Sequence, residues 1–287
     1  MRTSGFMIDM DGTVYKGTAK IEGADGMISL LRSKGIPFVF LTNNSSHSRR
    51  FYLEKLLGMG FDVTLDNVLT STVATVRFIL SERPGKKVYP IAVPEVVEEM
   101  EASGIRMSYD DPDIVLLAYD RTITFDKINA GYRFLMSGAE LIATHPDDLC
   151  PTEDSYDVDI GAFIDLFKKL CGVDPVIVGK PNGLMLDMAA REMGVDPLGT
   201  VMVGDRLYTD MLMADRAGIA SVLVLSGETS REDLERSDVK PSFVLDSVAD
   251  IASILDRFGG GGSGGKDTRV FSKQALKFVK YVIPYIP

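Results

Sequence analysis

The sequence lacks any uninterrupted apolar run close to the ~20 residues that a membrane-spanning helix needs. Its opening, MRTSGFMIDMDG, contains no apolar segment that ends in a cleavage site. We therefore expect a cytoplasmic protein. Cysteine is scarce as well, since the chain contains only Cys150 and Cys171. The two could form one bridge, but a reducing cytosol favours two reduced thiols.

Positive charge is in deficit, with 31 Lys and Arg against 41 Asp and Glu and a net charge of -10. A protein that binds duplex nucleic acid needs a clustered basic surface, so this balance argues against that class and favours small-molecule chemistry. The remaining composition is ordinary, with 45% hydrophobic and 25% charged residues among 287. It is typical of a soluble globular chain that is long enough for two domains.

Short apolar runs rich in Val, Ile, Leu and Phe recur along the chain, each bounded by turn residues. They predict buried strands at GFMIDM, PFVFLTN, DIVLLAYD, ELIATH, TVMVGD and ASVLVLSG. Helical patterns lie between several of these runs and end at Gly35, Gly60 and Gly104. Alternating strands and helices indicate a parallel sheet that is covered on both faces, so we expect an α/β fold with a doubly wound, Rossmann-like core.

In such folds ligands bind beyond the carboxyl ends of the strands, where polar residues follow several of the apolar runs. These residues are Asp9, Asp11 and Thr13; Thr42, Asn43, Asn44 and Ser45; Lys180; and Asp205 and Asp210. If Asp9, Asp11 and Asp205 meet at one edge of the sheet, three carboxylates cannot all stay ionised without a compensating cation.

Oxygen ligands, waters and a substrate phosphate together suit Mg²⁺ better than Ca²⁺ or Zn²⁺. Lys180 adds a second positive charge, and the Thr42 hydroxyl with the N–H groups of its turn offers donors for an oxyanion. The sequence therefore predicts a phosphate-binding metal site.

Each motif alone also has a structural explanation. The dipeptide DG is a common turn, GKPN suits a turn, and GDRLYTD suits the start of a helix. TNNSS could be a polar loop in which Ser45 or Ser46 caps the next helix. The four motifs occur together, each behind a predicted strand, and this joint occurrence favours the site.

DMDGT, TNNSS, GKPN and GDRLYTD together resemble the four sequence motifs of the haloacid dehalogenase superfamily. Their order, and the large insertion between the second and the third, resemble the NagD-like subgroup of phosphatases, class IIA with a C2-type cap, over residues 1 to about 258. The resemblance implies Mg²⁺-dependent hydrolysis of a small phosphate monoester through a phosphoaspartyl intermediate. A sugar phosphate, a nucleotide and an aryl phosphate all stay open as substrates.

The resemblance also implies roles for the acidic residues. Asp9 is the expected nucleophile, and Asp11 the expected general acid and then base. Asp9, the backbone carbonyl of Asp11, and Asp205 are the expected Mg²⁺ ligands, with Asp210 in support. Asp11 favours a phosphatase, because dehalogenation does not require an acid at that position.

Three further residues are expected, by the same resemblance, to bind the transferring phosphoryl group. They are Thr42, the backbone of Asn43, and Lys180. A phosphotransferase or phosphomutase is the weaker alternative, since a large cap of this kind resembles those of hydrolases.

The insertion predicts a core domain at residues 1–79 and 178–257 and a cap domain at residues 80–177, which is long enough to have its own core. The cap should select the leaving group, and the resemblance implies a homodimer through it. Its segment ATHPDDLCPTEDSYDVDIGAF occupies, by resemblance, the place of a substrate-facing loop. His145 stands there where the subgroup usually has Asn. A substrate contact and a solvent-bonded loop residue both stay open for His145, and His47 is expected at the start of a helix.

Residues 258–266, FGGGGSGGK, have the composition of a flexible linker, which we interpret as engineered. Residues 267–287 form a basic amphipathic pattern that could bind a protein partner, an anionic membrane or the acidic phosphatase surface. A disordered appended peptide is the open alternative. Two functions therefore stay open: an active phosphatase, and a phosphatase fold that serves as a soluble carrier for a fused peptide.

Overall fold

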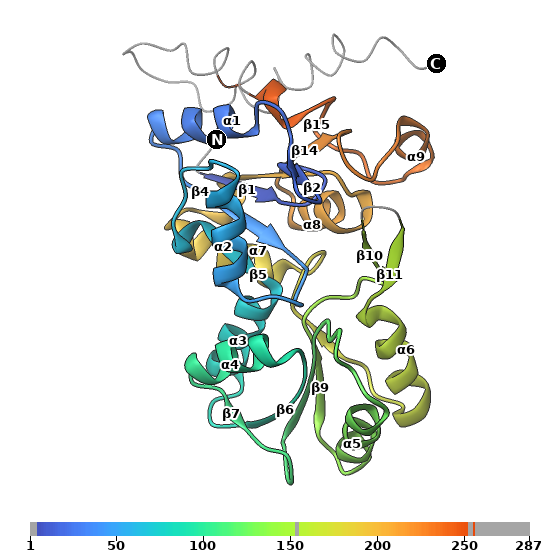
Figure 1. The fold of residues 1–287 in the computed structure, drawn as a ribbon. Helices are drawn as coiled ribbons and strands as arrows, with labels where there is room; N and C mark the ends of the chain where they lie inside the picture. The colour runs from blue at the N-terminus through green and yellow to red at the C-terminus, as the bar shows by residue number, and fades with distance from the viewer. Residues whose placement is uncertain (1–4, 153–154, 252–254, 256–287) are drawn as a thin grey trace. The chain divides into compact units, whose positions relative to one another are not determined.

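The computed structural model describes residues 5–152, 155–251 and 255, which form two compact units (Figure 1). Among the described residues, the first unit comprises 5–41, 56–67, 186–251 and 255, and the second comprises 42–55, 68–152 and 155–185. The chain passes between the units at four places: after Leu41, after Lys55 within α2 (Arg49–Gly58), after Asn67, and after Met185 within α7 (Gly183–Met193). The linker and the basic peptide predicted at residues 258–287 lie outside the described residues. The domain boundaries expected near residues 80 and 177 stay a prediction.

The first unit is built on a parallel sheet with the strand order β15-β14-β13-β1-β4. Its strands are β1 (Gly5–Asp9), β4 (Phe38–Thr42), β13 (Thr200–Gly204), β14 (Ala220–Val224) and β15 (Phe243–Leu245). Every residue of β1, β4 and β13 is buried, which is typical of a parallel sheet covered on both faces. The predicted doubly wound α/β core is confirmed.

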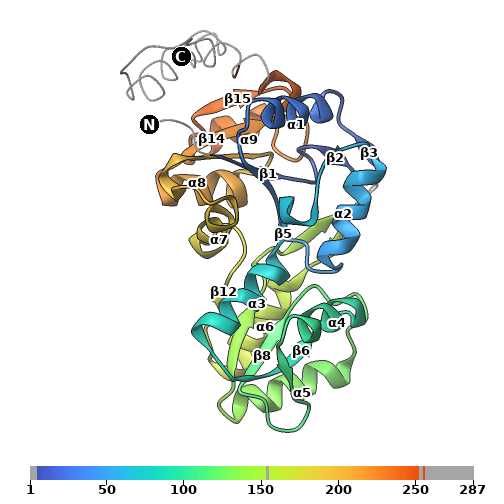
Figure 2. The ribbon, with the colours of Figure 1, turned by 90° about the vertical axis from the view of Figure 1, so that its left-hand side faces the viewer.

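Helices and short turns connect these strands (Figure 2). They are α1 (Ala24–Ser33), α8 (Leu212–Ala217) and α9 (Arg231–Arg236), the short helices Leu65–Asn67, Pro197–Gly199, Leu207–Met211 and Val248–Asp250, and a hairpin of β2 (Tyr15–Lys16) and β3 (Ala19–Lys20). Helix α1 buries Met27, Ile28 and Leu31, which the helical repeat places on one face. Gly35 follows it with φ 63, a left-handed conformation that favours glycine, as the sequence predicted for this end.

The second unit has its own parallel sheet, with the order β12-β9-β8-β6-β7. Its strands are β6 (Lys87–Ile91), β7 (Arg106–Met107), β8 (Ile114–Leu117), β9 (Glu140–Ala143) and β12 (Val176–Ile177). The strands predicted at DIVLLAYD and ELIATH are therefore present as β8 and β9. The order reverses between β6 and β8, as in other doubly wound sheets.

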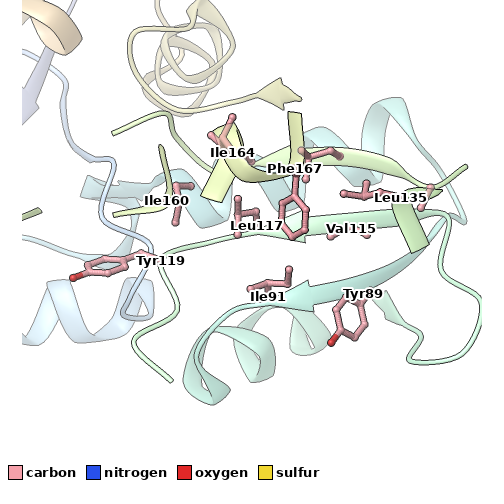
Figure 3. Packing of buried hydrophobic residues seen from close by; sticks show 12 residues of the cluster. Tyr89, Ile91, Val115, Leu117, Tyr119, Leu135, Ile160, Ile164 and Phe167 are labelled. Carbon is pink, nitrogen blue, oxygen red and sulfur yellow. The ribbon is translucent and has the colours of Figure 1, made fainter. Parts of the chain in front are cut away.

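The other elements of this unit are β5 (Val68–Thr70), α3 (Ser71–Glu82), α4 (Pro94–Ala102), α5 (Phe125–Met136), α6 (Ile160–Cys171) and the antiparallel pair β10 (Leu149–Pro151) and β11 (Tyr156–Val158). Phe167 of α6 and Leu135 of α5 pack with Val115 and Leu117 of β8 in one buried cluster (Figure 3). A Cβ atom on Gly131 would lie 2.9 Å from Ile91, so α5 packs closely against the sheet. The second unit thus has a hydrophobic core of its own.

Candidate active site

Three buried carboxylates meet at the carboxyl edge of the sheet in the first unit. Asp9 is the last residue of β1, Asp205 directly follows β13, and Asp210 lies in the short helix after it. Their carboxylate oxygens lie within 4.8 Å of one another. Strands β1 and β13 are parallel neighbours with Ile8 opposite Val203, so Asp9 and Asp205 arise at the same end of the sheet. Because all the donors are carboxylate oxygens, the group suits a hard divalent cation.

Glycine backbones surround these carboxylates. A Cβ atom on Gly227 would lie 2.0 Å from Asp205 Oδ2, and one on Gly12 would lie 2.3 Å from the same oxygen. A Cβ atom on Gly204 would lie 2.4 Å from the Asp210 side chain. The backbone N–H of Glu228 donates to Asp205 Oδ2 at 2.7 Å. Close backbone approach therefore fixes where the Asp205 and Asp210 carboxylates lie.

The electrostatics of the cluster favour a bound cation. Burial, followed by the negative charges of Asp9 and Asp210, raises the pKa of Asp205 well above its ordinary value. Arg206, next in sequence, supplies one positive charge nearby, but its Nε lies 2.9 Å from Glu228 Oε2 in an ion pair of its own. A divalent cation would remove the repulsion that disfavours ionised Asp205.

Asp11 is not among the three clustered carboxylates. It lies in a tight turn in which Met10 accepts hydrogen bonds from the N–H groups of Thr13 and Val14, at 3.2 and 2.9 Å. Asp11 is half-buried and forms an isolated backbone bridge with Tyr15. The sequence had predicted its backbone carbonyl as a ligand and its carboxylate as an acid, and both roles stay predictions.

The residues expected to bind a phosphoryl group lie in the second unit. Thr42, Asn43 and Lys180 are all buried. The Asn43 side chain holds the Lys180 backbone at both ends: Lys180 N–H donates to Asn43 Oδ1 at 2.9 Å, and Asn43 Nδ2 donates to Lys180 O at 2.9 Å. The other Asn43 Nδ2 hydrogen bond goes to Asp147 Oδ1 at 3.0 Å. Both N–H groups of the Asn43 side-chain amide already have acceptors, so only its backbone N–H can donate to a bound anion, as the resemblance implied.

The neighbouring serines correct one alternative explanation of TNNSS. Ser45 Oγ accepts from Tyr119 N–H at 2.8 Å, and Ser46 Oγ donates to Asn44 Oδ1 at 2.8 Å. Neither caps α2; instead Ser48 Oγ accepts from Phe51 N–H at 3.3 Å. The alternative in which Ser45 or Ser46 caps the next helix is therefore wrong, because α2 begins only at Arg49.

Both histidines of the chain lie among the described residues. His145 is 0% exposed, so the interpretation as a solvent-bonded loop residue is wrong. His47 lies two residues before α2 and stacks on Phe51 with ring centroids 3.8 Å apart.

Neither Cys150 nor Cys171 forms a disulfide among the described residues. In the part of the chain that the structure describes, no helix is both long and apolar enough to cross a bilayer.

Sequence reasoning missed the partners that hold the expected site. Asp147 lies in the quoted loop segment ATHPDDLCPTEDSYDVDIGAF and Gly227 ends the quoted strand segment ASVLVLSG, but neither was expected to support the site, and Glu228 lies in no quoted segment. All three lie shortly after the end of β9 or β14, and this position near a strand end was a signal that could have found them.

Comparison with known proteins identifies related sequences for both units. A sequence model of the family described as haloacid dehalogenase-like hydrolase matches residues 6–106, and one described as HAD-hydrolase-like matches residues 177–251. The chain is 33% identical over 246 residues to 5'-nucleotidase YutF of Bacillus subtilis, covering 86% of this chain and 96% of that protein.

Two solved structures are similar over most of their length. The 4-nitrophenylphosphatase of Thermotoga maritima is 37% identical, with a TM-score of 0.84, and the match covers 87% of this chain and 96% of that one. NagD of E. coli K-12 is 30% identical, with a TM-score of 0.81, and the match covers 87% of this chain and 98% of that one.

Proposed function

Because the chain belongs to the haloacid dehalogenase-like hydrolase family and is similar to NagD over most of its length, we propose that it is a Mg²⁺-dependent phosphatase that forms a phosphoaspartyl intermediate. The chain is a phosphoric monoester hydrolase that acts on small phosphate substrates. The observation that carries the metal and the mechanism is the buried group of Asp9, Asp205 and Asp210.

The proposed reaction has two displacements at phosphorus. An Asp9 carboxylate oxygen attacks phosphorus while the bond to the ester oxygen breaks, and Asp11 gives its proton to that leaving oxygen. Asp11 then takes a proton from water, whose oxygen attacks phosphorus and releases inorganic phosphate and the Asp9 carboxylate. The two steps together consume one water and regenerate both side chains.

The other residues stabilise charge rather than form bonds. Asp9, the Asp11 carbonyl and Asp205 would hold Mg²⁺, with Asp210 in support, and the ion would neutralise charge on the phosphoryl oxygens. Lys180, with the Thr42 hydroxyl and the Asn43 N–H, would bind those oxygens as well.

The predicted cap at residues 80–177 would select the leaving group, and a homodimer through it stays a prediction. A relative named as a 5'-nucleotidase and a structure named as a 4-nitrophenylphosphatase support nucleotides and aryl phosphates as the first esters to test, followed by sugar phosphates. Cytoplasmic location and a partner for the basic peptide stay predictions as well.

The test is release of inorganic phosphate from a panel of these esters, with Mg²⁺ and with a chelator. The proposal expects release that requires Mg²⁺ and differs among esters. Release that continues undiminished in chelator would contradict the metal, and no release from any ester by folded protein would favour the carrier function. Phosphoryl transfer to added alcohol in preference to water would instead indicate a phosphotransferase.

A further inference from the structure

His145, just beyond the end of β9, is a fully buried titratable residue that the proposed chemistry does not use. Three hydrogen-bonding groups of the second unit surround its ring. Its Nε2 lies 3.3 Å from Ser45 Oγ and 3.7 Å from Asp159 Oδ1. Its Nδ1 accepts from the backbone N–H of Asp147 at 3.4 Å. Buried polar groups are normally hydrogen-bonded, and this ring has a polar neighbour at each of its nitrogens.

The hydrogen bonds at His145 indicate which ring nitrogen carries the proton in the neutral form. Because Nδ1 of His145 is an acceptor, a neutral ring carries its proton on Nε2, which faces two acceptors. Ser45 Oγ accepts from Tyr119 N–H at 2.8 Å and lies 2.9 Å from Thr144 Oγ1, to which its own proton is then donated. A serine hydroxyl has one donor and two acceptor positions, so Ser45 can bond to Tyr119 N–H, Thr144 Oγ1 and His145 Nε2 at once.

The network leads from the ring to the phosphate-binding residues. The backbone of Asp147 bonds to His145, and its carboxylate accepts from Asn43 Nδ2 at 3.0 Å. Asn43 in turn holds both the N–H and the carbonyl of Lys180. Two hydrogen-bonded residues thus separate the imidazole from the lysine.

The opposite side of the ring leads to α6 and β8. Asp159 caps α6 by accepting from Ile160 N–H at 2.7 Å, and Ser45 holds Tyr119 just beyond β8. Ile160 and Tyr119 both belong to the buried cluster of this unit (Figure 3). His145 therefore connects the phosphate-binding residues to a rigid hydrophobic core.

We propose that His145 is a positioning residue for phosphoryl transfer. Its ring holds the loop that carries Asp147, and Asp147 holds Asn43 and Lys180 in the orientation that binds the phosphoryl group. The inference rests on the proposed function, since it takes Lys180 and the Asn43 N–H as phosphoryl ligands. It assigns His145 no contact with the leaving group.

This role makes a distinctive kinetic prediction. Every phosphate monoester presents the same phosphoryl group, so misplaced Lys180 should lower kcat/KM by one common factor for all esters. A misplacement of about 1 Å costs on the order of 100-fold, so we expect a loss of roughly 10- to 100-fold. A residue that touched the leaving group would give a different factor for each ester.

Three substitutions of His145 distinguish the contacts of its two ring nitrogens. His145→Asn retains an acceptor for the N–H two residues later, a contact that asparagine commonly makes. His145→Gln places its amide nearer the position of Nε2, and His145→Leu removes both contacts. The control is His47→Gln, because the chain's other histidine is in the same unit but contacts Arg121 and Glu95 instead of this network.

The experiment measures kcat/KM for a nucleotide, an aryl phosphate and a sugar phosphate, the inhibition constant of inorganic phosphate, and the thermal unfolding temperature. We expect the common loss in His145→Leu, weaker phosphate inhibition, partial recovery in His145→Asn or His145→Gln, and wild-type values in His47→Gln. A folded His145→Leu variant with wild-type kinetics, or losses that differ among esters, would overturn the role.

If His145→Leu does not fold, His145→Ala, which also removes both contacts, is measured in its place, and wild-type kinetics in a folded His145→Ala variant would overturn the role equally. Failure of the proposed function is distinguishable from failure of this inference, because the former would leave the wild-type protein without phosphate release. Calorimetric binding of inorganic phosphate to wild type and variants then provides the comparison without turnover.

Discussion

Gly227→Ala should damage metal binding through a single added methyl group. The Cβ atom would lie 2.0 Å from Asp205 Oδ2 and must come to at least 3.0 Å, so something must move by about 1 Å. The backbone of Gly227 has an ordinary φ, which limits the strain to this contact. The neighbouring hydrogen bond from Glu228 N–H to Asp205 Oδ2 resists that movement.

A ligand displaced by about 1 Å should lower kcat/KM at limiting Mg²⁺ by roughly 10- to 100-fold. The assay is a titration of phosphatase activity with Mg²⁺, with thermal unfolding measured in parallel. Gly26→Ala is the matched control: it lies within α1 with open space around its Cβ position, so it should leave Mg²⁺ dependence unchanged and stabilise the helix by about 0.5–1 kcal/mol. A Gly227→Ala enzyme with the wild-type Mg²⁺ titration would show that the close approach of Gly227 to Asp205 does not control metal binding.

Two further predictions concern stability. Burial and the charges of Asp9 and Asp210 raise the pKa of Asp205, so the metal-free folded state binds a proton more readily than the unfolded chain. The contribution of Asp205 to the free energy of unfolding in chelator should therefore fall as the pH rises above the carboxyl group's ordinary pKa of about 3.9, and Asp205→Asn should remove that contribution. If the free energy of unfolding, measured with urea across the pH range, changes with pH in parallel for the two proteins, the prediction is wrong. Phe167→Ala should lower the free energy of unfolding of the second unit by about 3–5 kcal/mol, because it removes a buried ring from the core. The control Leu170→Ala, at an exposed position of the same helix, should change it by less than about 0.5 kcal/mol. Equal urea midpoints for the two variants would contradict this packing.

The acidic cluster was predictable because it follows from the ends of strands. Asp9 and Asp205 each come directly after, or at the end of, an apolar run, and parallel neighbouring strands end at the same edge of a sheet. The sequence needed only the correct strands to bring these two carboxylates together. Asp210 joins them because the turn after β13 folds back as a short helix.

The network around His145 was not predictable in the same way. Its members lie on loops far apart in sequence, and Asn43 is 104 residues from Asp147. Hydrophobic periodicity indicates which residues face a core but not which loop side chains meet. For the same reason the capping role of Ser45 was wrong: its hydroxyl is engaged by Tyr119, which is 74 residues away.

The proposed mechanism requires that Asp9 becomes phosphorylated during turnover. The most direct measurement is acid quenching of the Mg²⁺-loaded protein during turnover of a good substrate, followed by mass spectrometry of its peptides. A phosphoaspartyl intermediate predicts one phosphoryl group on the peptide that contains Asp9 in the wild-type protein, and neither that modification nor turnover in a folded Asp9→Asn variant. Near-normal phosphate release by Asp9→Asn, or a phosphoryl group on a different peptide, would contradict it.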